Sequence, residues 1–301
     1  MRPRGSSSVA EVEAPAKVNL FLRVFDERPD RFHELETLFQ AVDFADHVRV
    51  ERAEAGVQLE LRGAGADLGP MEENLAYRAA ARLLGEAGIE GGFRISLLKR
   101  IPVGAGLGGG SSDAAAVLRC AAALAGIPDD DPRLRRMGAE LGSDVAFFLG
   151  PSPLAAGRGR GDVLEPFGAL PVPDLVLVSP PVHVSTAWAY RALDESRRAH
   201  GAAPAPSLKG RPRDWGDVAA EAHNDFQPVV ATAHPEVTRS LAALSAAGAR
   251  PALMSGSGST SFGIFASRVA AEKAAEGLRS DLGWTCSVVR TLTAFPAPRL
   301  S

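Results

Sequence analysis

The sequence predicts an α+β protein with two domains, and three observations lead to this prediction. The 301 residues suit two domains of medium size, and the 31 glycines and 22 prolines indicate short elements. A Gly- and Pro-rich stretch from Gly150 to Gly161 separates two halves of different pattern. Without its extra helices, the second half has the order strand–helix–strand–strand–helix–strand of a split βαβ unit. We therefore expect a first domain over residues 9–162 and a second over residues 163–301.

Alternating aliphatic residues, helix N-cap residues and glycines at helix ends predict the elements of the first half. Lys17–Val24 is the clearest strand, because alternate residues from position 18 are aliphatic, which leaves Lys17 and Asn19 on the opposite face. Asn74 is typical of an N-cap and predicts a helix that runs to about Gly88. The other predicted elements are strands at 47–52, 57–62 and 93–98, an alanine-rich helix ending near Gly126, a helix from Pro132 to Leu141, and a helix that opens with Asp144 after a Ser143 cap.

The second half begins with a predicted strand over Asp174–Ser179 and ends with one over Thr285–Thr291. Between them the pattern predicts two short strands, Ala252–Ser255 and Ser261–Phe265, around a Gly/Ser turn. The predicted helices of this half cover 185–196, 217–232, 235–248 and 268–279.

The composition is that of an ordinary folded protein: 46% of the residues are hydrophobic, 23% are charged, and the formal net charge is −3. A protein with this net charge does not attract nucleic acid or anionic lipid through an overall positive potential. The two cysteines, Cys120 and Cys286, cannot form a disulfide framework in a chain of this length, which favours a reducing compartment. No segment has the pattern of a membrane span or a signal peptide. We expect a cytoplasmic protein that binds neither nucleic acid nor membrane.

A glycine-rich loop is the strongest functional signal. Gly104–Ser112 reads GAGLGGGSS and is followed by Asp113 and three alanines. The glycines allow the backbone to approach a ligand closely, and the residues after them open a helix whose N-terminus carries partial positive charge. Oriented amides at a helix end bind anions, so the segment predicts a phosphate site. The alternative is a plain turn between a strand and a helix, in which Ser111 serves only as a cap.

Two common phosphate motifs do not fit this loop. The GxGxxG spacing within residues 104–109 matches the dinucleotide fingerprint, but residues 99–103 separate it from the preceding strand, and residues 128–132 form a loop where a second strand is required. A P-loop would have a lysine where Gly110 stands. The positive charge that a phosphate requires must therefore come from another part of the chain.

Two other segments are candidates to complete such a site. Lys17 and Asn19 place a cation and an amide two residues apart on one strand face, and the alternative reading of Lys17 is an exposed strand lysine. Met254–Thr260 is a second loop of small residues, and its alternative reading is a tight connection between two strands.

Taken in order, the lysine strand, the glycine loop and the Gly/Ser loop resemble those of the GHMP kinases, which include galactokinase, homoserine kinase and mevalonate kinase. The resemblance extends over about residues 10 to 290. The segments that carry it are APAKVNLFL (14–22), RPDRFHELETLFQAVDFAD (28–46), ENLAYRAA (73–80), IPVGAGLGGGSSDAAAVL (101–118), GSDVAFFL (142–149), RGRGDVLEP (158–166), VSTAWAYRAL (184–193), NDFQPVV (224–230) and MSGSGSTSFGIF (254–265).

The resemblance implies a two-domain GHMP kinase fold, with an N-terminal domain like ribosomal protein S5 and a C-terminal ferredoxin-like domain of the split βαβ type. It also implies phosphoryl transfer from ATP, with Mg²⁺ as the expected metal ion, to a small-molecule alcohol. The segments at 28–46 and 184–193 are similar to those of members that phosphorylate the 2-hydroxyl of a CDP-linked methylerythritol, on the non-mevalonate route to isoprenoid precursors. The implied partners are these two small molecules, bound by a monomer or homodimer.

The same resemblance implies roles for individual residues. Asp144 matches the catalytic aspartate, which would orient the substrate hydroxyl and accept its proton, and Lys17 matches the lysine beside it. The residues implied to bind ATP are Asn74, Lys99, Pro102, Val103, Gly104, Ala105, Gly106, Leu107, Gly108, Gly109, Gly110, Ser111 and Ser112. The residues implied to bind the alcohol substrate are Asn19, Phe32, His33, Tyr190, Gly256 and Ser257. No metal ligand is implied, and Ser112 is the one candidate from the sequence.

The segment around His33 departs from the family pattern, in which Asp-Gly-Tyr-His is usual. Here the four residues are Asp30, Arg31, Phe32 and His33. Phe32 keeps an aromatic face for stacking on a pyrimidine and lacks the hydroxyl. An arginine at position 31 is unfavourable if that position needs a positive φ. The nucleoside pocket is therefore where this chain is expected to differ from its relatives.

Three other functions fit part of the pattern. Another GHMP kinase, for homoserine or mevalonate, would share the ATP loop but not the segments at 28–46 and 184–193. A noncatalytic nucleotide-binding sensor would need neither Lys17 nor Asp144. A dinucleotide oxidoreductase is disfavoured by the surroundings of the glycine loop.

Overall fold

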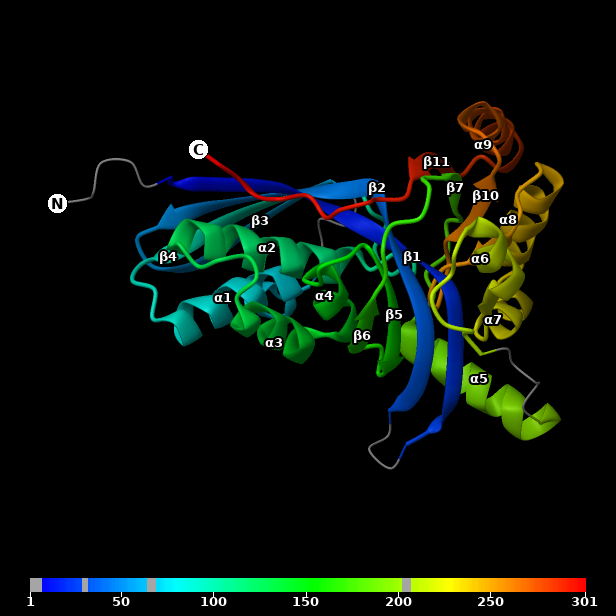
Figure 1. Cartoon of the computed structure of the whole chain (residues 1–301), viewed down its shortest axis with the longest axis horizontal. Coiled ribbons are helices and arrows are strands. Elements are labelled where there is room, and N and C mark those ends of the chain that lie inside the picture. The colour runs from blue at the N-terminus through cyan, green and yellow to red at the C-terminus, as the bar shows by residue number, and fades with distance from the viewer. Residues whose placement is uncertain (1–6, 29–31, 64–68, 202–206) are drawn as a thin grey trace.

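A computed structural model describes residues 7–28, 32–63, 69–201 and 207–301. Two sheets organise the chain: a large N-terminal sheet with helices on one face, and a smaller C-terminal sheet with its own helices (Figure 1). Within these ranges, no helix combines the length and the apolar character needed to cross a membrane. The mixture of helix and strand agrees with the predicted α+β class.

Two long strands, β1 (Val9–Glu27) and β2 (His33–Ala53), form an antiparallel hairpin that passes through both halves of the molecule (Figure 1). The strand predicted at Lys17–Val24 is only the central part of β1, and the strand predicted at 47–52 is only the end of β2. The prediction found only the stretch of β1 in which aliphatic residues alternate, although residues 14–22 are buried on both faces, between the core clusters of the two halves.

The N-terminal sheet has the order β12-β1-β2-β4-β3, and a hairpin of β5 and β6 pairs with β2. Its further strands are β3 (Gly56–Gly63), β4 (Gly92–Lys99), β5 (Leu154–Gly159), β6 (Val163–Pro166) and β12 (Arg299–Leu300). Its helices are η1 (Met71–Glu73), α1 (Leu75–Ala87), α2 (Gly109–Ala125), α3 (Pro132–Leu141) and α4 (Ser143–Phe148). The buried alanines of α2 allow this helix to pack closely on β1 and β2.

The C-terminal sheet has the order β11-β7-β10-β9, with every neighbouring pair antiparallel. Its strands are β7 (Asp174–Ser179), β9 (Ala252–Met254), β10 (Ser261–Phe265) and β11 (Thr285–Arg290). The helices of this half are α5 (Thr186–His200), α6 (Trp215–Glu221), α7 (Gln227–Ala233), α8 (Pro235–Ala246) and α9 (Arg268–Leu282). Helices α8 and α9 pack on one face of the sheet, and the other face packs against β1 and β2. The predicted split βαβ arrangement is confirmed.

Several predicted helix limits are wrong, including the following three. The single helix expected over 217–232 is two helices, α6 and α7, separated by a short strand, β8 (His223–Asn224), which pairs in parallel with β1. Helix α2 begins at Gly109 with Gly108 as its N-cap, because the Ser112 N–H already donates to the Gly108 carbonyl. Ser143 is the first residue of α4 and does not cap it.

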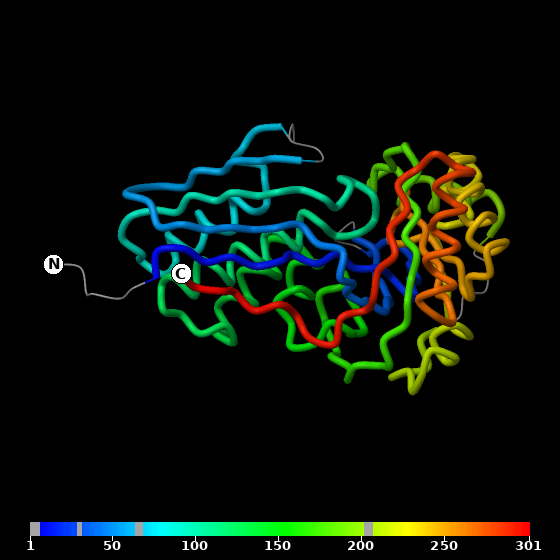
Figure 2. Tube along the Cα trace, turned by 90° about the horizontal axis from the view of Figure 1, so that it is seen from above, coloured from blue at the N-terminus to red at the C-terminus, as the bar shows by residue number. Residues whose placement is uncertain are grey.

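Hydrogen bonds cross the division expected between residues 162 and 163. Strand β6 lies after that point and pairs with β5 in the N-terminal sheet. The end of the chain also returns to this sheet, where β12 pairs with the beginning of β1, so the red tail runs beside the blue strand in Figure 2. The division into 9–162 and 163–301 stays a prediction.

Candidate active site

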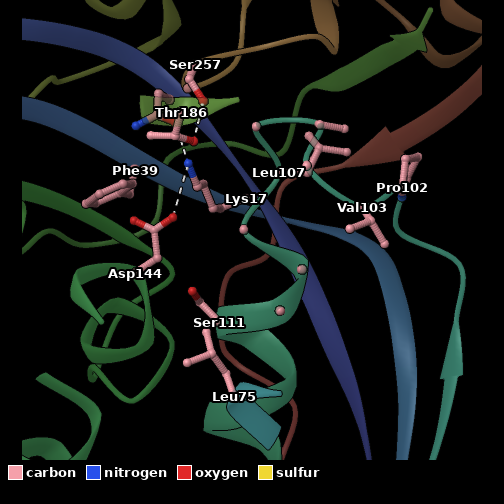
Figure 3. Close-up of a pocket in the computed structure, with 18 of the residues that line it drawn as sticks. Lys17, Phe39, Leu75, Pro102, Val103, Leu107, Ser111, Asp144, Thr186 and Ser257 are labelled. Carbon is pink, nitrogen blue, oxygen red and sulfur yellow. Dashed lines mark hydrogen bonds and ion pairs between the residues drawn. The ribbon is translucent and has the colours of Figure 1, made fainter. Parts of the chain in front are cut away.

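A cavity of about 360 Å³ lies where the two halves of the molecule meet (Figure 3). Most of the residues expected at the site line it: the loop 102–111, Asn74, Lys99, Lys17, Asn19, Asp144, Tyr190, Gly256 and Ser257. Phe32 and His33 line an adjoining cavity of about 880 Å³, and Tyr190 lines both cavities. The fold thus brings together residues from both halves of the sequence.

The glycine loop is packed against the C-terminal domain. Gly104, Gly106 and Gly108 have φ angles of 64°, 77° and 69°, a region that residues with a Cβ disfavour. A Cβ on Gly106 would lie 2.0 Å from the carbonyl oxygen of Ser255, and one on Gly104 would lie 2.1 Å from Cε1 of His183. The glycines are therefore required by contacts within the protein, in addition to the close approach of a ligand expected from the sequence.

Helix α2 starts directly at the end of this loop. Its first three residues, Gly109, Gly110 and Ser111, line the cavity. The N–H groups of a first helical turn have no acceptor within the helix, and they carry the positive end of the helix dipole. The Ser111 hydroxyl points from this turn toward the side of the cavity where Asp144 lies (Figure 3). This end of the cavity is suited to bind an anion.

Lys17 from β1 and Asp144 from α4 meet in the cavity, as expected (Figure 3). Lys17 Nζ lies 3.4 Å from Asp144 Oδ2, and the aspartate side chain is 31% exposed against 6% for the lysine. Lys17 Nζ also donates to Asn19 Oδ1 at 2.6 Å. Asn19 Nδ2 in turn donates to Thr37 Oγ1, which donates to the Phe21 carbonyl. The lysine and the amide are thus held in place, and the carboxylate faces the open space.

The Gly/Ser loop between β9 and β10 fastens the glycine loop to the C-terminal domain. Ser255 Oγ donates to the Gly106 carbonyl at 2.9 Å, and the Thr260 N–H donates to the Ala105 carbonyl at 3.2 Å. Ser255 Oγ also accepts the N–H of Asn19 at 3.3 Å. One buried hydroxyl therefore joins the glycine loop to the strand that carries Asn19.

The Gly/Ser loop has supports that sequence reasoning did not identify. Asn224 Nδ2 donates to the carbonyls of Met254 and Gly256 at 2.7 Å and 2.8 Å. The hydroxyls of Ser257 and Thr186 lie 2.9 Å apart. Asn224 and Thr186 were part of segments that resemble the family, but no local pattern pointed to these contacts.

The adjoining cavity has an aromatic wall. The rings of His33 and Tyr190 stack with centroids 4.9 Å apart and planes 24° apart. His33 Nδ1 lies 2.8 Å from the Phe25 carbonyl, and its Nε2 lies 3.3 Å from Asp194 Oδ2, so both ring nitrogens have partners. Burial raises the pKa of Tyr190 to about 12, and the charge of Asp144 adds to this effect. The phenol therefore stays neutral at physiological pH.

Arg160 links the two cavities, and sequence reasoning did not single it out. It lines both of them, and its guanidinium carbon lies 4.9 Å from the centroid of the Phe32 ring. The Phe32 side chain is largely open to solvent, with 51% exposure. Arg31, the other departure from the family pattern, lies outside the described residues. The nearest signal in the sequence was the segment at 158–166, to which no role was attached.

Lys99 lines the cavity, but its ammonium group is buried between two carboxylates. Lys99 Nζ donates to Asp46 and, at 2.6 Å, to Asp113 Oδ2. Burial alone would lower the pKa of Lys99, but the charges of Asp113 and Asp46 outweigh it and raise the pKa. Burial also raises the pKa of Asp113 to about 7, against the opposing effect of Lys99. The charge of this lysine is compensated within the protein.

The family models that match are those of the GHMP kinases N terminal domain, over residues 74–150, and the GHMP kinases C terminal domain, over residues 204–283. A 4-diphosphocytidyl-2-C-methyl-D-erythritol kinase of Geobacter sp. (strain M21) is 42% identical over 280 residues, which cover 93% of this chain and 98% of the relative. A crystal structure of 4-(cytidine 5'-diphospho)-2C-methyl-D-erythritol kinase, 38% identical, matches with a TM-score of 0.77 over 93% of this chain and 98% of its own. A homoserine kinase structure from Cytophaga hutchinsonii, 21% identical with a TM-score of 0.69 and covering 100% of this chain and 99% of its own, shares the fold alone.

Identity of this extent along nearly the whole chain, on the same fold, defines the class: this is a GHMP kinase, an enzyme that phosphorylates small molecules. Within that class, the chain belongs to the 4-diphosphocytidyl-2-C-methyl-D-erythritol kinase family. The predicted family and two-domain fold are confirmed. The dinucleotide oxidoreductase alternative is wrong, since the glycine loop follows a strand of a largely antiparallel sheet.

Proposed function

We propose that the chain transfers the γ-phosphoryl group of ATP to the 2-hydroxyl of 4-(cytidine 5'-diphospho)-2-C-methyl-D-erythritol, giving ADP and the 2-phosphate. The observation that carries the proposal is the Lys17–Asp144 pair in the glycine-loop cavity, which adjoins the aromatic cavity. The names of the relatives at 42% and 38% identity support this acceptor. A nucleotide in one cavity and a CDP-linked alcohol in the other would meet close to this pair.

On the ATP side, the proposed contacts are the loop 102–111 and Asn74. The amides at the start of α2 are suited to the phosphates. Pro102 and Val103 offer an apolar surface beside the loop, where Val103 is 46% exposed, and such a surface is suited to a purine ring. The glycines that follow in the loop would let the phosphates approach the backbone closely.

Phosphoryl transfer depends mainly on position and on charge stabilisation. The substrate hydroxyl oxygen attacks the γ-phosphorus, its proton passes to the Asp144 carboxylate, and the bond from that phosphorus to the bridging oxygen of ADP breaks. The Lys17 ammonium stabilises the carboxylate and the charge on the transferred group. Asn19 is fixed by its bonds to Lys17 and Thr37, and it retains one amide N–H for the substrate.

Mg²⁺ is part of the proposal, because the ion would neutralise the negative charge that develops on the phosphate oxygens during transfer. Magnesium keeps several waters and usually takes one or two protein ligands. Among the described residues, no three His, Cys, Asp or Glu side chains gather as a metal site. Phosphate oxygens and water would therefore supply most ligands, with Asp144 and the Ser111 hydroxyl as the protein oxygens that face the cavity. Ser112 does not fit this role, since it is buried and lines a separate crevice with Val12 and Pro15.

The two substrates are the only partners that we propose, in a monomer or homodimer without nucleic acid or membrane. The net charge of −3 supports the absence of a nucleic-acid partner. Both proposed substrates are small, charged nucleotides of the kind found inside the cell, which supports a cytoplasmic location for this protein.

Turnover of the cytidine-linked substrate tests the proposed function. With ATP and Mg²⁺, the purified protein is expected to convert 4-(cytidine 5'-diphospho)-2-C-methyl-D-erythritol into ADP and one phosphorylated product, whose 2-phosphate is located by ³¹P–¹H NMR. Homoserine and mevalonate serve as controls and are expected to give no product, because neither has a base to occupy the aromatic cavity. Equal turnover of either control would contradict the proposed substrate, and ATP binding without any turnover would favour a noncatalytic sensor.

Tyr190→Ala is expected to raise the KM for the CDP-linked substrate by roughly 5- to 100-fold, as the loss of one base-stacking ring implies. Tyr190→Phe keeps the ring and is expected to leave this KM within about two-fold, and both variants keep the KM for ATP. Steady-state kinetics with each substrate varied in turn provide the measurement. A change confined to the KM for ATP would contradict the placement of cytidine in the aromatic cavity.

A further inference from the structure

We propose that Lys99 is a positioning residue, which shapes the glycine loop through two buried carboxylates, Asp46 and Asp113, and does not itself contact a phosphate. This inference rests on the proposed function in one respect only, namely that the glycine loop binds ATP. Each of the two carboxylates holds a different end of the loop.

Asp46 in β2 holds the beginning of the loop. Its Oδ2 accepts a hydrogen bond from the Lys99 ammonium, and its Oδ1 accepts the backbone N–H groups of Arg100 and Ile101, the latter at 2.8 Å. Asp46 has no exposed surface. The first two residues after β4 are therefore tied to β2 by a side chain with three donors around it, so its position is strongly determined.

Asp113 holds the far end of the loop. It lies in the second turn of α2, its side chain is 4% exposed, and its Oδ2 accepts from Lys99 Nζ at 2.6 Å. The Lys99 ammonium thus joins β2, the end of β4 and the beginning of α2 at one point. Residues 100–108 have both ends fixed to the same buried group.

The close packing around Lys99 shows that the start of α2 lies directly against it. A Cβ on Gly109, the first residue of the helix, would lie 3.3 Å from Lys99 Nζ and 3.0 Å from Ile101 Cγ2. On the other side, a Cβ on Gly63 would lie 2.2 Å from the Lys99 carbonyl oxygen. A shift of the lysine would therefore move the helix end that binds the phosphates.

The charges around Lys99 argue against a direct phosphate contact. A lysine that binds a phosphate needs an ammonium charge that is not already neutralised, whereas the Lys99 side chain is 2% exposed and faces two carboxylates. With both carboxylates ionised the cluster has a net charge of −1, which repels an anion. Burial is the main cause of the raised pKa of Asp113, and the charge of Asp46 adds to the rise while Lys99 opposes it. Arg160, Lys17 and the end of α2 remain to attract the phosphates.

The two roles of Lys99 predict opposite changes when one carboxylate is removed. If Lys99 were a phosphate ligand, Asp113→Ala would release its charge and tighten ATP binding. If Lys99 positions the loop, Asp113→Ala loosens one anchor, and the Kd for ATP rises roughly ten-fold or more. Asp46→Asn is expected to act in the same direction through the other anchor. Asp113→Asn keeps an oxygen opposite Lys99 and is expected to hold the Kd within about three-fold of the unaltered chain.

Calorimetric titration of the full chain with ATP alone measures these constants and does not depend on the acceptor substrate. Failure of the CDP-linked alcohol to react would overturn the proposed function and leave this test intact. Asp174→Asn is the matched control, since Asp174 is also mostly buried, lies 3.3 Å from an Arg290 nitrogen, and lines neither cavity. It is expected to leave the Kd unchanged.

Kinetics separate positioning from a general loss of stability. Asp113→Ala is expected to raise the KM for ATP and to leave the KM for the CDP-linked substrate unchanged, whereas simple destabilisation lowers the Tm and moves neither constant. Tighter ATP binding in either carboxylate variant, an unchanged Kd in Asp113→Ala, or no ATP binding by the unaltered chain would overturn the proposal. If Asp46→Asn does not fold, Asp113→Ala and Asp113→Asn decide the matter.

Discussion

Asp144→Asn is expected to lower kcat by roughly 10²- to 10⁴-fold, while the protein still binds ATP at least as tightly as the unaltered chain. Asparagine has the shape of aspartate but cannot accept the proton of the substrate hydroxyl, and it leaves Lys17 without a counter-charge. The aspartate side chain is 31% exposed, so the change is expected to have little effect on folding. ADP release measured in a coupled assay gives kcat, and calorimetry gives the Kd.

Asp217→Asn is the matched control for this experiment. Asp217 also lies in the first turn of a short helix, α6, is 28% exposed, and pairs with Arg213 at 2.9 Å, but it lines neither cavity. Its substitution is expected to leave kcat unchanged. If the Asp144 and Asp217 variants had equal activity, Asp144 would have no part in the proton transfer and the mechanism would be wrong.

Gly106→Ala is expected to damage both the stability of the protein and its binding of ATP. At a φ of 77° a residue with a Cβ is disfavoured by about 1–2 kcal/mol. The new Cβ would also lie 2.0 Å from the Ser255 carbonyl oxygen, so one of the two loops must move. The free energy of unfolding is expected to fall by about 2–5 kcal/mol, and the Kd for ATP to rise at least about ten-fold.

Gly277→Ala provides the control for a change of the same size. Gly277 lies in α9, where a new Cβ would meet, among the described residues, no atom within 4 Å apart from the adjacent backbone of its own helix. Alanine there is expected to raise the free energy of unfolding by up to about 1 kcal/mol, because it favours the helix. Urea denaturation of both variants gives the comparison. Equal stability of the two variants would show that the contact between the glycine loop and Ser255 is not needed.

Elements with local signals at both ends could be predicted closely from the sequence. Helix α1 begins after Asn74, whose side chain accepts the N–H of Ala76, and it ends at Gly88 with a left-handed φ of 60°. Strand β7 was predicted with its observed limits, Asp174–Ser179. The residues that end α1 act on their own neighbours, and Pro173 and Pro180 stand directly outside the two ends of β7.

Elements that depend on distant partners could not be predicted in this way. Strand β8 interrupts an otherwise helical pattern because His223 and Asn224 pair with β1, and the Asn224 side chain binds two carbonyls of the Gly/Ser loop. The first part of β2 looked like a loop although it forms a hairpin with β1, and its other neighbour, β5, lies far away in the sequence. Tertiary hydrogen bonds decided these segments.

For the candidate site, the sequence predicted which residues line the cavity better than it predicted the charges around them. Lys17 and Asp144 could be named from the resemblance, and their side chains lie 3.4 Å apart. The sequence contained no sign that Asp46 and Asp113 neutralise Lys99, because the three residues lie on separate elements. Nothing in the sequence indicated that Arg160 lines both cavities, because its position depends on how the β5–β6 hairpin packs in the tertiary structure.

The long β1–β2 hairpin makes the two halves of the molecule parts of a single frame. Both strands extend without a break into a hydrophobic cluster that they share with β7, β9 and β10. A hinge rotation of one half over a bound nucleotide would expose the buried side chains of this cluster to water, which is unfavourable in free energy. Entry and departure of the ligands therefore fall to the side chains and short loops around the cavity mouths.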